Sequence, residues 1–260
     1  MPGGHPLVGE SLDVPGLFPY DCYRAVTILT DADSVPLDGF SEVLLADDFG
    51  ADLAHLRRGR DTGDQNLQHY SVDWNYMPLA GGSVVHTHHQ PVASPMPTNH
   101  HREMEDGLRR YGGDYFGNVV RVEEGGERWV GCEGGVSWLT GFATSGYIDM
   151  VSVLEGRASL FDLMDEDVGA LASSVLKIFD CLYDENFASF NFSLYGLEGA
   201  EGFAVNCRLS PRFPLSNASR ASDVNYFEVS NAESLAFFYA KATARELRER
   251  FAGPEGGSSR

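Results

Sequence analysis

The chain has 260 residues, enough for one large domain or two small fused ones, and 43% of them are hydrophobic, which fits a globular protein and excludes a disordered one. The 19 basic residues against 38 acidic ones give a formal net charge of −19 at pH 7. Because nucleic acids and anionic membranes are bound by surplus Lys and Arg, this balance argues against both partners. A small anionic ligand can still bind in a locally positive pocket.

The four cysteines, Cys22, Cys132, Cys181 and Cys207, are widely spaced and form no CxxC pair. This spacing argues against a cysteine-based zinc site and a disulfide framework, so we expect reduced thiols. The sequence shows no basic-then-apolar signal segment and no apolar run of the roughly 18 residues that a membrane span needs. These features predict a cytoplasmic protein that has no membrane partner.

The first part of the chain predicts strands and one helix after a flexible leader. Residues 1–15 are rich in Gly and Pro, which is typical of a loose segment. Several later segments combine β-branched and aromatic residues between Gly, Pro or Asp, which is the pattern of strands. The predicted strands are 26–30, 42–46, 69–76 and 83–93, and a polar helix is predicted at 99–111.

The second part predicts more strands and two longer helices. The strands are expected at 129–132, 136–143, 147–154, 187–195 and 203–209. A helix is predicted at 162–183 because acidic residues fill its first turn and apolar residues recur at helical spacing, at Val168, Leu171, Val175, Ile178 and Leu182. Ser230 and Glu233 form a capping-box pattern, which predicts a second helix beginning at Ser230. Residues 253–260 predict a disordered tail.

Strands with flanking helices in two successive groups predict an α+β fold made of two related halves. We place the first half at residues 16–112 and the second half at residues 113–252.

Residues 80–90, AGGSVVHTHHQ, concentrate the chemistry of the chain. Alternate side chains of an extended strand face the same way, so we expect His86, His88 and Gln90 on one face and His89 on the other. Gly81 and Gly82, just upstream, allow the backbone to approach a ligand closely, and Ser83 adds a hydroxyl. Neutral imidazole is a good nucleophile toward phosphorus near pH 7, and its attack would divide one displacement into two through a phosphoramidate.

The pattern N-x5-G-x-S-x2-H-x-H-x-Q, formed by Asn75, Gly81, Ser83, His86, His88 and Gln90, resembles the galactose-1-phosphate uridylyltransferase family. That family is a branch of the histidine-triad superfamily and also includes dinucleoside tetraphosphate phosphorylases. Weaker similarity covers residues 41–46, 134–155, 190–195, 207–213 and 230–251. The resemblance implies two histidine-triad-like halves, with antiparallel sheets and flanking helices.

The resemblance also implies that the first half is active and the second is degenerate. Ala204, Asn206 and Arg208 stand where the resembling proteins carry a His-x-His-x-Glu strand.

Roles for individual residues follow from the same resemblance. It implies that His88 is the nucleotidylated nucleophile, that Gln90 bonds the transferred phosphoryl group, and that His86 supports the site or binds a structural zinc. The phosphates would be contacted by Asn75, Gly81, Gly82 and Ser83. The implied substrate is a nucleotide or nucleotide sugar. The implied assembly is a homodimer, in which the second half of one subunit completes the site of the other.

Gln90 is informative about the type of reaction. Histidine-triad hydrolases carry a third histidine at this position, and Gln cannot shuttle protons at neutral pH, so Gln90 favours transfer over hydrolysis. At two places the sequence lacks residues that the family uses, and these differences change which metal site and which acceptor we expect. Cys22 has no CxxC partner to complete the usual zinc site, and residues 221–230 lack the Glu and Gln that hold a hexose phosphate. We therefore expect an acceptor other than galactose 1-phosphate.

Other functions remain compatible with the same residues. One is a nucleotide hydrolase or dinucleoside polyphosphate phosphorylase, and another is a nucleotide-binding protein without catalysis. A third is a metal enzyme for lyase or redox chemistry, because imidazole clusters suit Zn, Fe or Ni. Its candidate ligands are His86, His88 and His89, with His100 and His101 nearby. Arg208 and Arg212 are candidates to bind a phosphate or carboxylate, or to pair with surface acids.

Overall fold

The computed structural model of the protein describes residues 7–8, 11–15, 23–61, 66–142, 144, 146, 148–214 and 239–252. Its strands are β1 (Leu7–Val8), β2 (Ser11–Pro15), β3 (Tyr23–Ile28), β4 (His69–Tyr76), β5 (His88–Ser94), β6 (Trp129–Glu133), β7 (Val136–Thr140), β8 (Met150–Leu154), β9 (Ser189–Leu197) and β10 (Asn206–Arg212). The helices are α1 (Glu42–Asp61), α2 (Asn99–Tyr111), α3 (Tyr115–Glu123), α4 (Asp165–Asp184) and α6 (Ala240–Phe251). Short 3-10 turns lie at η1 (Leu37–Gly39), η2 (Pro78–Ala80) and η3 (Leu160–Asp162).

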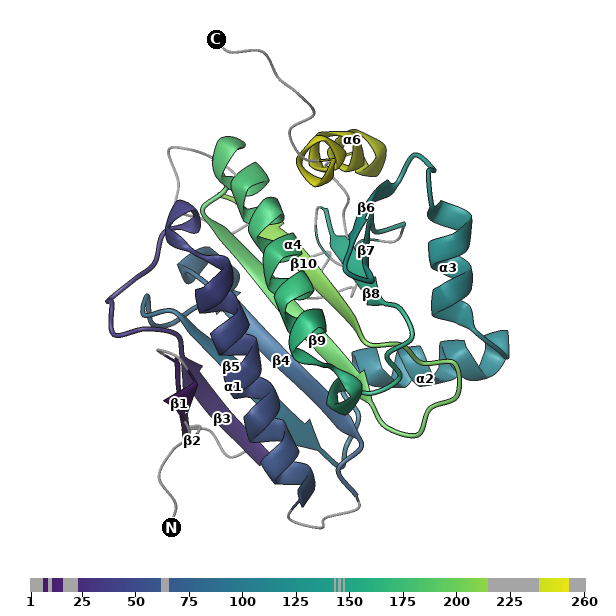
Figure 1. Ribbon diagram of the computed structural model, residues 1–260, viewed down its shortest axis with the longest axis horizontal. Coiled ribbons are helices and arrows are strands. Elements are labelled where there is room, and N and C mark those ends of the chain that lie inside the picture. Colours follow the sequence, from purple (N-terminus) through teal and green to yellow (C-terminus); the bar gives the residue numbers. More distant parts are fainter. Residues whose placement is uncertain are drawn as a thin grey trace.

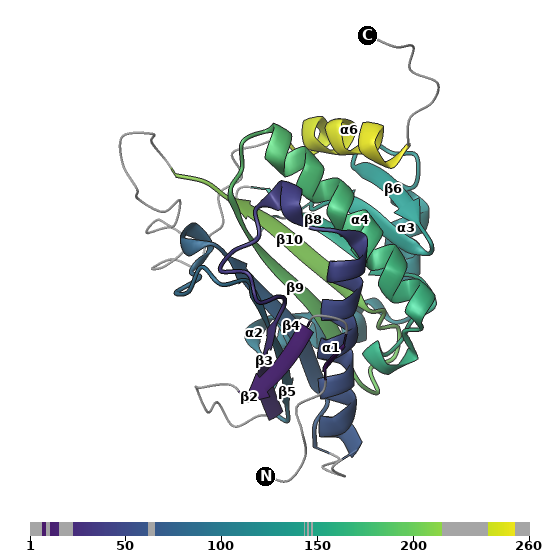
Figure 2. The same ribbon diagram turned by 60° about the vertical axis from the view of Figure 1, so that its left-hand side comes forward.

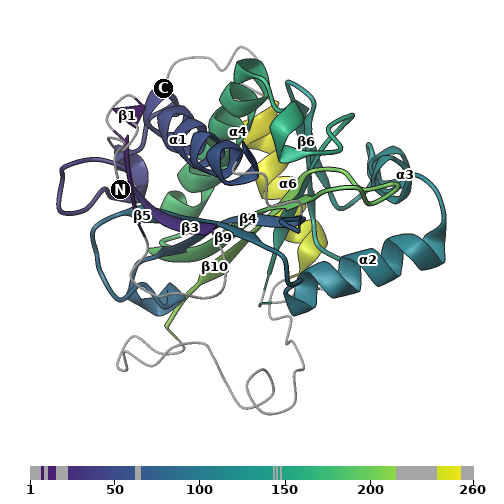
Figure 3. The same cartoon turned by 90° about the horizontal axis from the view of Figure 1, so that it is seen from below.

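The strands form one sheet in the order β1-β2-β3-β5-β4-β9-β10-β8-β7-β6, and all of its neighbouring strands are antiparallel. Helices α1 and α4 lie side by side on one face of the sheet (Figures 1 and 2). We call this side the helix face. Seen from below, α2 lies on the opposite side of the sheet (Figure 3). The main hydrophobic core therefore lies between the helix face and the two helices, and a functional site can lie on the other face.

The core of the helix face is aromatic at its centre. Alternate residues of β4 and β9 point toward α1 and α4, because side chains of a strand alternate between its two faces. Trp74 of β4 and Phe190 of β9 have ring centroids 4.9 Å apart, and Phe179 of α4 lies 4.8 Å from Phe190. All three side chains are buried. This packing fixes both central strands against α4.

The same order of strands and helix occurs twice along the chain. Strands β2 and β3, helix α1 and strands β4 and β5 follow one another, and β7, β8, α4, β9 and β10 repeat that order. In the sheet the two groups run β2-β3-β5-β4 and then β9-β10-β8-β7, so the second group mirrors the first about the β4–β9 pair. The predicted α+β fold of two related halves is confirmed, and β10 occupies in the second half the place of β5 in the first.

Several predicted elements match closely. Strand β4 and helix α2 have the predicted bounds, and α4 is shifted from the predicted helix by a few residues at its start. Helix α2 begins where expected because the Thr98 side chain accepts a hydrogen bond from the backbone N–H of His101, at 3.2 Å. The acidic first turn of α4 complements its helix dipole, and Asp167 accepts from the backbone N–H of Met164 at 2.8 Å.

The strand predicted at residues 42–46 is wrong, since these residues begin helix α1. The buried side of this helix includes Asp48, Asp52 and His55 besides its apolar residues. These polar residues interrupt the apolar repeat that marks a helix in sequence. The helix α3 was not predicted either.

The prediction of a flexible leader at residues 1–15 also needs correction. Strand β2 pairs with β3, from Leu12 opposite Ile28 to Pro15 opposite Ala25, and β1 pairs with β2.

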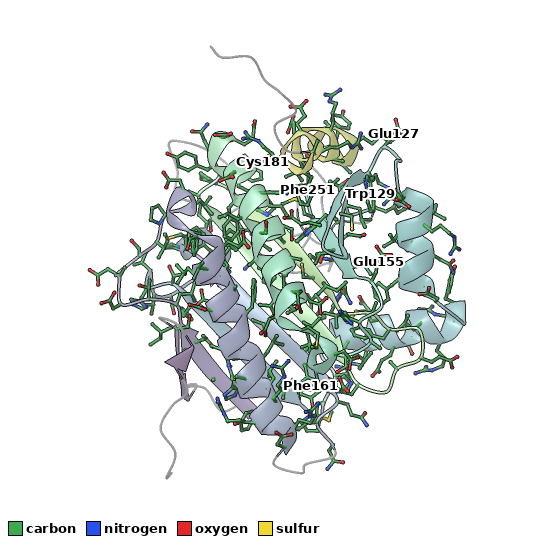
Figure 4. All side chains as sticks on the ribbon, in the orientation of Figure 1. Glu127, Trp129, Glu155, Phe161, Cys181 and Phe251 are labelled. Carbon is green, nitrogen blue, oxygen red and sulfur yellow. The ribbon has the colours of Figure 1, made fainter. Side chains whose placement is uncertain are left out.

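At the other end of the chain, α6 covers the edge of the sheet at β6. Phe251 and Trp129, both labelled in Figure 4, belong to these two elements, and Arg248 donates a hydrogen bond to the Trp129 carbonyl at 2.6 Å. The predicted helix start at Ser230, the predicted tail and Cys22 lie outside the described residues.

The described cysteines are free thiols, as expected, with Cys181 and Cys207 buried and Cys132 exposed. Among the helices of the described residues, none combines the length and apolar character that crossing a membrane requires.

Buried acids tie α1 to three strands behind it. Asp52 accepts from His89 Nδ1 of β5 at 2.7 Å and from the Thr27 hydroxyl of β3 at 2.5 Å, and the Ser11 hydroxyl of β2 donates to Asp48. Burial raises the pKa of Asp48 to about 7, although His89 opposes the shift. Burial opposes the charged form of His89, but the charge and hydrogen bond of Asp52 and the charge of Asp48 together outweigh it, so the pKa of His89 is raised.

We predict that Asp48 makes the protein less stable as the pH rises. The folded state binds this proton more tightly than the unfolded chain, whose Asp pKa is near 3.8. The free energy of unfolding should therefore fall by about 2 kcal/mol between pH 5.5 and pH 8. Urea unfolding at both pH values should show that Asp48→Asn removes this part of the slope. Asp180→Asn, at an exposed position of α4, is the control and should leave the slope unchanged.

Candidate functional site

The face of the sheet opposite the helix face is polar, and we call it the polar face. Residues of β5 alternate between half-buried and buried, and His88 and Gln90 are half-buried on the polar face while His89 is buried on the helix face. His88 Nδ1 lies 2.8 Å from the backbone carbonyl of His86. A carbonyl can only accept, so Nδ1 donates its hydrogen. In the neutral ring the lone pair is then on Nε2, the atom available for attack.

The contact of His86 with His88 is made by the backbone carbonyl of His86. The strand predicted at residues 83–93 begins only at His88, because residues 83–86 form a bend. The expectation that His86 shares a strand face with His88 and Gln90 is therefore wrong for His86. Its carbonyl orients the His88 ring, and this contact does not depend on its imidazole.

The loop that precedes β5 is shaped by glycines and by a residue of the second half. Gly81 has a φ of +87°, in the left-handed region that favours glycine. A Cβ on Gly82 would lie only 2.8 Å from the Asn75 carbonyl oxygen, so the turn has no room for a side chain. Asn191 of β9 donates to Asn75 Oδ1 and to the Ala80 carbonyl, both at 2.8 Å. This loop leaves Ser83 exposed.

Gln90 is oriented by Arg24 of β3. The Arg24 guanidinium donates to Gln90 Oε1. The amide NH₂ of Gln90 is therefore the group left to donate to a ligand. Arg24 lies opposite Val92 in the β3–β5 pairing, so both residues share the polar face with Gln90 and His88.

Asp73 lies beside Gln90, because the two residues are directly opposite in the β4–β5 pairing. Its two carboxylate oxygens accept from Ser71 at 2.7 Å and from Ser193 at 2.6 Å. Burial raises the pKa of Asp73, and the two serine hydrogen bonds and Arg24 oppose that shift.

The row of polar side chains continues into the second half. Asp73 pairs with Ser193, and Ser193 pairs with Arg208 of β10. Gln90, Asp73, Ser193 and Arg208 therefore lie on four adjacent strands of the polar face. Arg208 contacts Asp149, with 3.5 Å between Nη1 and Oδ2. Asp149 is fully buried.

The histidines do not converge on a common point. His88 and His89 point to opposite faces of β5, and His89 is bonded to Asp52 on the helix face. His101 of α2 contacts His69, with ring centroids 5.3 Å apart, and His100 contacts Tyr195 at 4.4 Å. In the part of the chain that the structure describes, no group of at least three His, Cys, Asp or Glu side chains is placed to hold a metal ion.

The described residues therefore do not fit the three-histidine metal site of His86, His88 and His89. They do not fit the family's usual zinc site either.

Sequence reasoning missed Arg24, Asp73 and Asn191. Each is a polar residue within a strand that is otherwise rich in apolar or aromatic residues. A polar residue at such a position is a signal, but strand pairing decides which of these residues meet. Asn191 is 116 residues from Asn75 in the chain. Arg208 was a candidate either to bind an anion or to pair with an acid, and the structure places it on the polar face in contact with Asp149.

Comparison with known proteins places the chain among recognised folds. No family model matches it. An uncharacterized protein of Archaeoglobus fulgidus is 26% identical over 246 residues, which are 93% of this chain and 73% of the relative. An ADP-glucose phosphorylase from Arabidopsis thaliana with bound ADP-glucose superposes with a TM-score of 0.75 and 14% identity, covering 92% of this chain and 81% of that one. A uridylyltransferase mutant gives a TM-score of 0.77 and 13% identity, with 94% and 89% covered.

These similarities establish the class of fold. The chain shares its α+β fold with the ADP-glucose phosphorylase and with the uridylyltransferase mutant, so the predicted resemblance is confirmed at the level of the fold. Its sequence identity to these two structures and to a GalT-like protein from Arabidopsis thaliana is 13–15%.

We predict that the neutral His88 ring carries its hydrogen on Nδ1, because the His86 carbonyl accepts from that atom. Nitrogen-15 NMR of histidine-labelled protein at pH 8 should show, for His88, a ring signal with a protonated Nδ1 and an unprotonated Nε2. That signal should disappear in His88→Asn and persist in His86→Ala. An Nε2–H tautomer for His88 would contradict the hydrogen bond to the carbonyl.

Proposed function

We propose that the protein is a nucleotidyltransferase in which His88 carries the nucleotidyl group. Nε2 of His88 attacks the α-phosphorus of a nucleotide sugar or dinucleotide, and the bond to the phosphorylated leaving group breaks. In the second step a phosphate oxygen of the acceptor attacks the same phosphorus. The P–N bond then breaks and its electron pair returns to Nε2.

The orientation of His88 is the observation that carries this proposal. The bond from Nδ1 to the His86 carbonyl leaves the Nε2 lone pair as the reactive group of a half-buried ring. The same bond supports the positive charge that the ring acquires while it holds the phosphoryl group, because the carbonyl oxygen accepts from a cationic imidazole as well.

The neighbouring groups supply donors for phosphate. The amide NH₂ of Gln90, two residues along the same strand face, is oriented by Arg24 for donation to a phosphoryl oxygen. The backbone N–H groups of Gly81 and Gly82 donate to the carbonyls of Pro78 and Met77, at 3.0 and 3.2 Å, and hold the turn before β5. Ser83 adds an exposed hydroxyl beside this turn. Asn75 supports this loop through Asn191 and the Ala80 carbonyl.

The similar folds agree with this reaction class. One superposing structure is a uridylyltransferase, and another is a phosphorylase with bound ADP-glucose. Both names describe transfer of a group to an acceptor other than water. Gln90 favours the same outcome, since its amide cannot exchange protons with a water nucleophile at neutral pH. We therefore infer that the acceptor is a phosphate group, and that hydrolysis is the slower side reaction.

We predict a covalent adduct on His88. Intact-protein mass spectrometry after incubation with a panel of nucleotide sugars and dinucleotides should show the mass gain of one nucleotidyl group. His88→Ala removes the nucleophile and should abolish the gain. His86→Ala is the matched control, because the backbone carbonyl that orients His88 remains, and it should retain most of the adduct.

The His86→Ala control also tests whether the adduct depends on the backbone carbonyl of His86 or on its imidazole. Loss of the adduct in His86→Ala, in a protein that still unfolds cooperatively, would contradict the assignment of its role to the backbone. Adduct formation in His88→Ala, or no adduct with any donor in the panel, would overturn the covalent route.

A further inference from the structure

A large cavity lies in the second half, away from His88. Its volume is about 930 Å³, within the range of small-molecule sites. Helices α2 and α3 form one wall, and the ends of β7, β8 and β10 form the other. Figures 1 and 3 show these two helices at the edge of the molecule beside β6, β7 and β8.

Most of the cavity wall is apolar. Its apolar lining includes Met104, Leu108, Phe116, Val119, Val151 and Val153. A buried sugar hydroxyl without a hydrogen-bond partner is unfavourable by about 1–3 kcal/mol, and this apolar part of the wall provides no partner. The lining also includes the charged residues Glu103, Arg110, Glu123 and Arg128. Aromatic rings of Tyr111, Tyr115 and Phe116 succeed one another along the helical wall, with centroids about 5.3 Å apart. The wall therefore suits a planar aromatic body rather than a sugar.

Polar groups gather over β10. Asn206 and Arg208 lie two residues apart on this strand and both line the cavity. His100 also lines it and stacks on Tyr195, which is the β9 partner of Asn206. Burial, together with Arg208 and His101, lowers the pKa of His100 to about 4, so this ring is neutral at pH 7.

Arg208 is the cationic residue of this polar group on β10, and its contact with the buried Asp149, 3.5 Å from Nη1 to Oδ2, holds the guanidinium in place. Its side chain is 24% exposed. A guanidinium has five donors in a fork that matches phosphate oxygens.

The cavity is separate from the nucleophile. Arg208 lies three strands from Gln90 across the polar face, along β4 and β9. With strands spaced about 4.8 Å apart, this corresponds to about 14 Å. A ligand bound at Arg208 leaves the ring of His88 accessible, so both positions can be occupied at once.

We propose that this cavity is a second ligand site, which binds a phosphorylated compound with an aromatic body. The ring lies against the apolar wall of α2 and α3, and the phosphate is bound by the guanidinium of Arg208. The second half, whose strand β10 has no histidine, thus binds a ligand although it carries no nucleophile.

Gly107 of α2 allows a direct test. It lines the cavity, and a Cβ at this position would have no atom within 4 Å. Gly107→Phe therefore fills the cavity without a clash at Cβ. Isothermal titration calorimetry should show that 1-naphthyl phosphate binds to the wild type and that Gly107→Phe weakens this binding roughly tenfold or more. Gly169→Phe is the matched control, because Gly169 of α4 has equally open space and does not line the cavity.

The choice of ligands tests each part of the proposed chemistry. 1-Naphthol, which lacks the phosphate, and glucose 1-phosphate, which lacks the ring, should both bind about tenfold more weakly than 1-naphthyl phosphate. Equal binding by 1-naphthol would overturn the role of Arg208. If glucose 1-phosphate bound more strongly than 1-naphthyl phosphate, the inference that the ligand has an aromatic body would be wrong. Binding that Gly107→Phe leaves unchanged would place the ligand elsewhere.

The outcome is independent of the proposed transfer reaction. His88→Ala should bind 1-naphthyl phosphate as the wild type does, because His88 does not line the cavity. An adduct on His88 without naphthyl phosphate binding would overturn this second site alone. Binding without any adduct would overturn the nucleotidyl transfer alone.

Discussion

The pairing of β4 with β9 is the interaction on which the rest of the structure depends. It runs from His69 opposite Leu197 to Tyr76 opposite Phe190 and joins the two halves in one sheet. Because side chains alternate along each strand, the same pairing produces both faces at once. Trp74 and Phe190 enter the aromatic core, while Asp73 and Ser193 meet on the polar face. The first half therefore cannot form its site alone, since Asn191 of the second half holds the loop before β5.

The alternation of side chains along a strand also separates the two consecutive histidines of β5, which point to opposite faces of the sheet. His88 has an open polar environment, and His89 is buried against Asp52 on the other face. A one-residue shift of this strand would bury His88 and expose His89, which is bonded to α1, so the register is strongly determined. Breaking a buried ion pair by removing one partner usually costs about 3–5 kcal/mol. The polar residues of α1 thus stabilise the position of the His88 backbone from behind the sheet.

Local patterns were sufficient for part of the fold and of the site. Strand β4 and helix α2 were predicted with their observed bounds, because their residue types and ends agree with one local structure. Helix α1 was missed because Asp48 and Asp52 are buried by partners on distant strands, which no local pattern reveals. His88 and Gln90 share a strand face as predicted. The orientation of each depends on a contact that the strand rule does not contain, from the bend at His86 and from Arg24 of β3.

The two halves share a fold and differ in the chemistry that they can support. Strand β10 occupies in the second half the place of β5 in the first, and it carries Asn206 and Arg208 but no histidine. An amide is not a nucleophile, and a guanidinium stays protonated at neutral pH, so this strand cannot carry a covalent phosphoryl group. It can bind one through Arg208, because a guanidinium has five hydrogen-bond donors. The fold places His88 and Arg208 on one continuous polar face, with Gln90 and Arg208 about 14 Å apart across the strands. On the proposed assignments, the second half is then a binding surface beside the nucleophilic site of the first half.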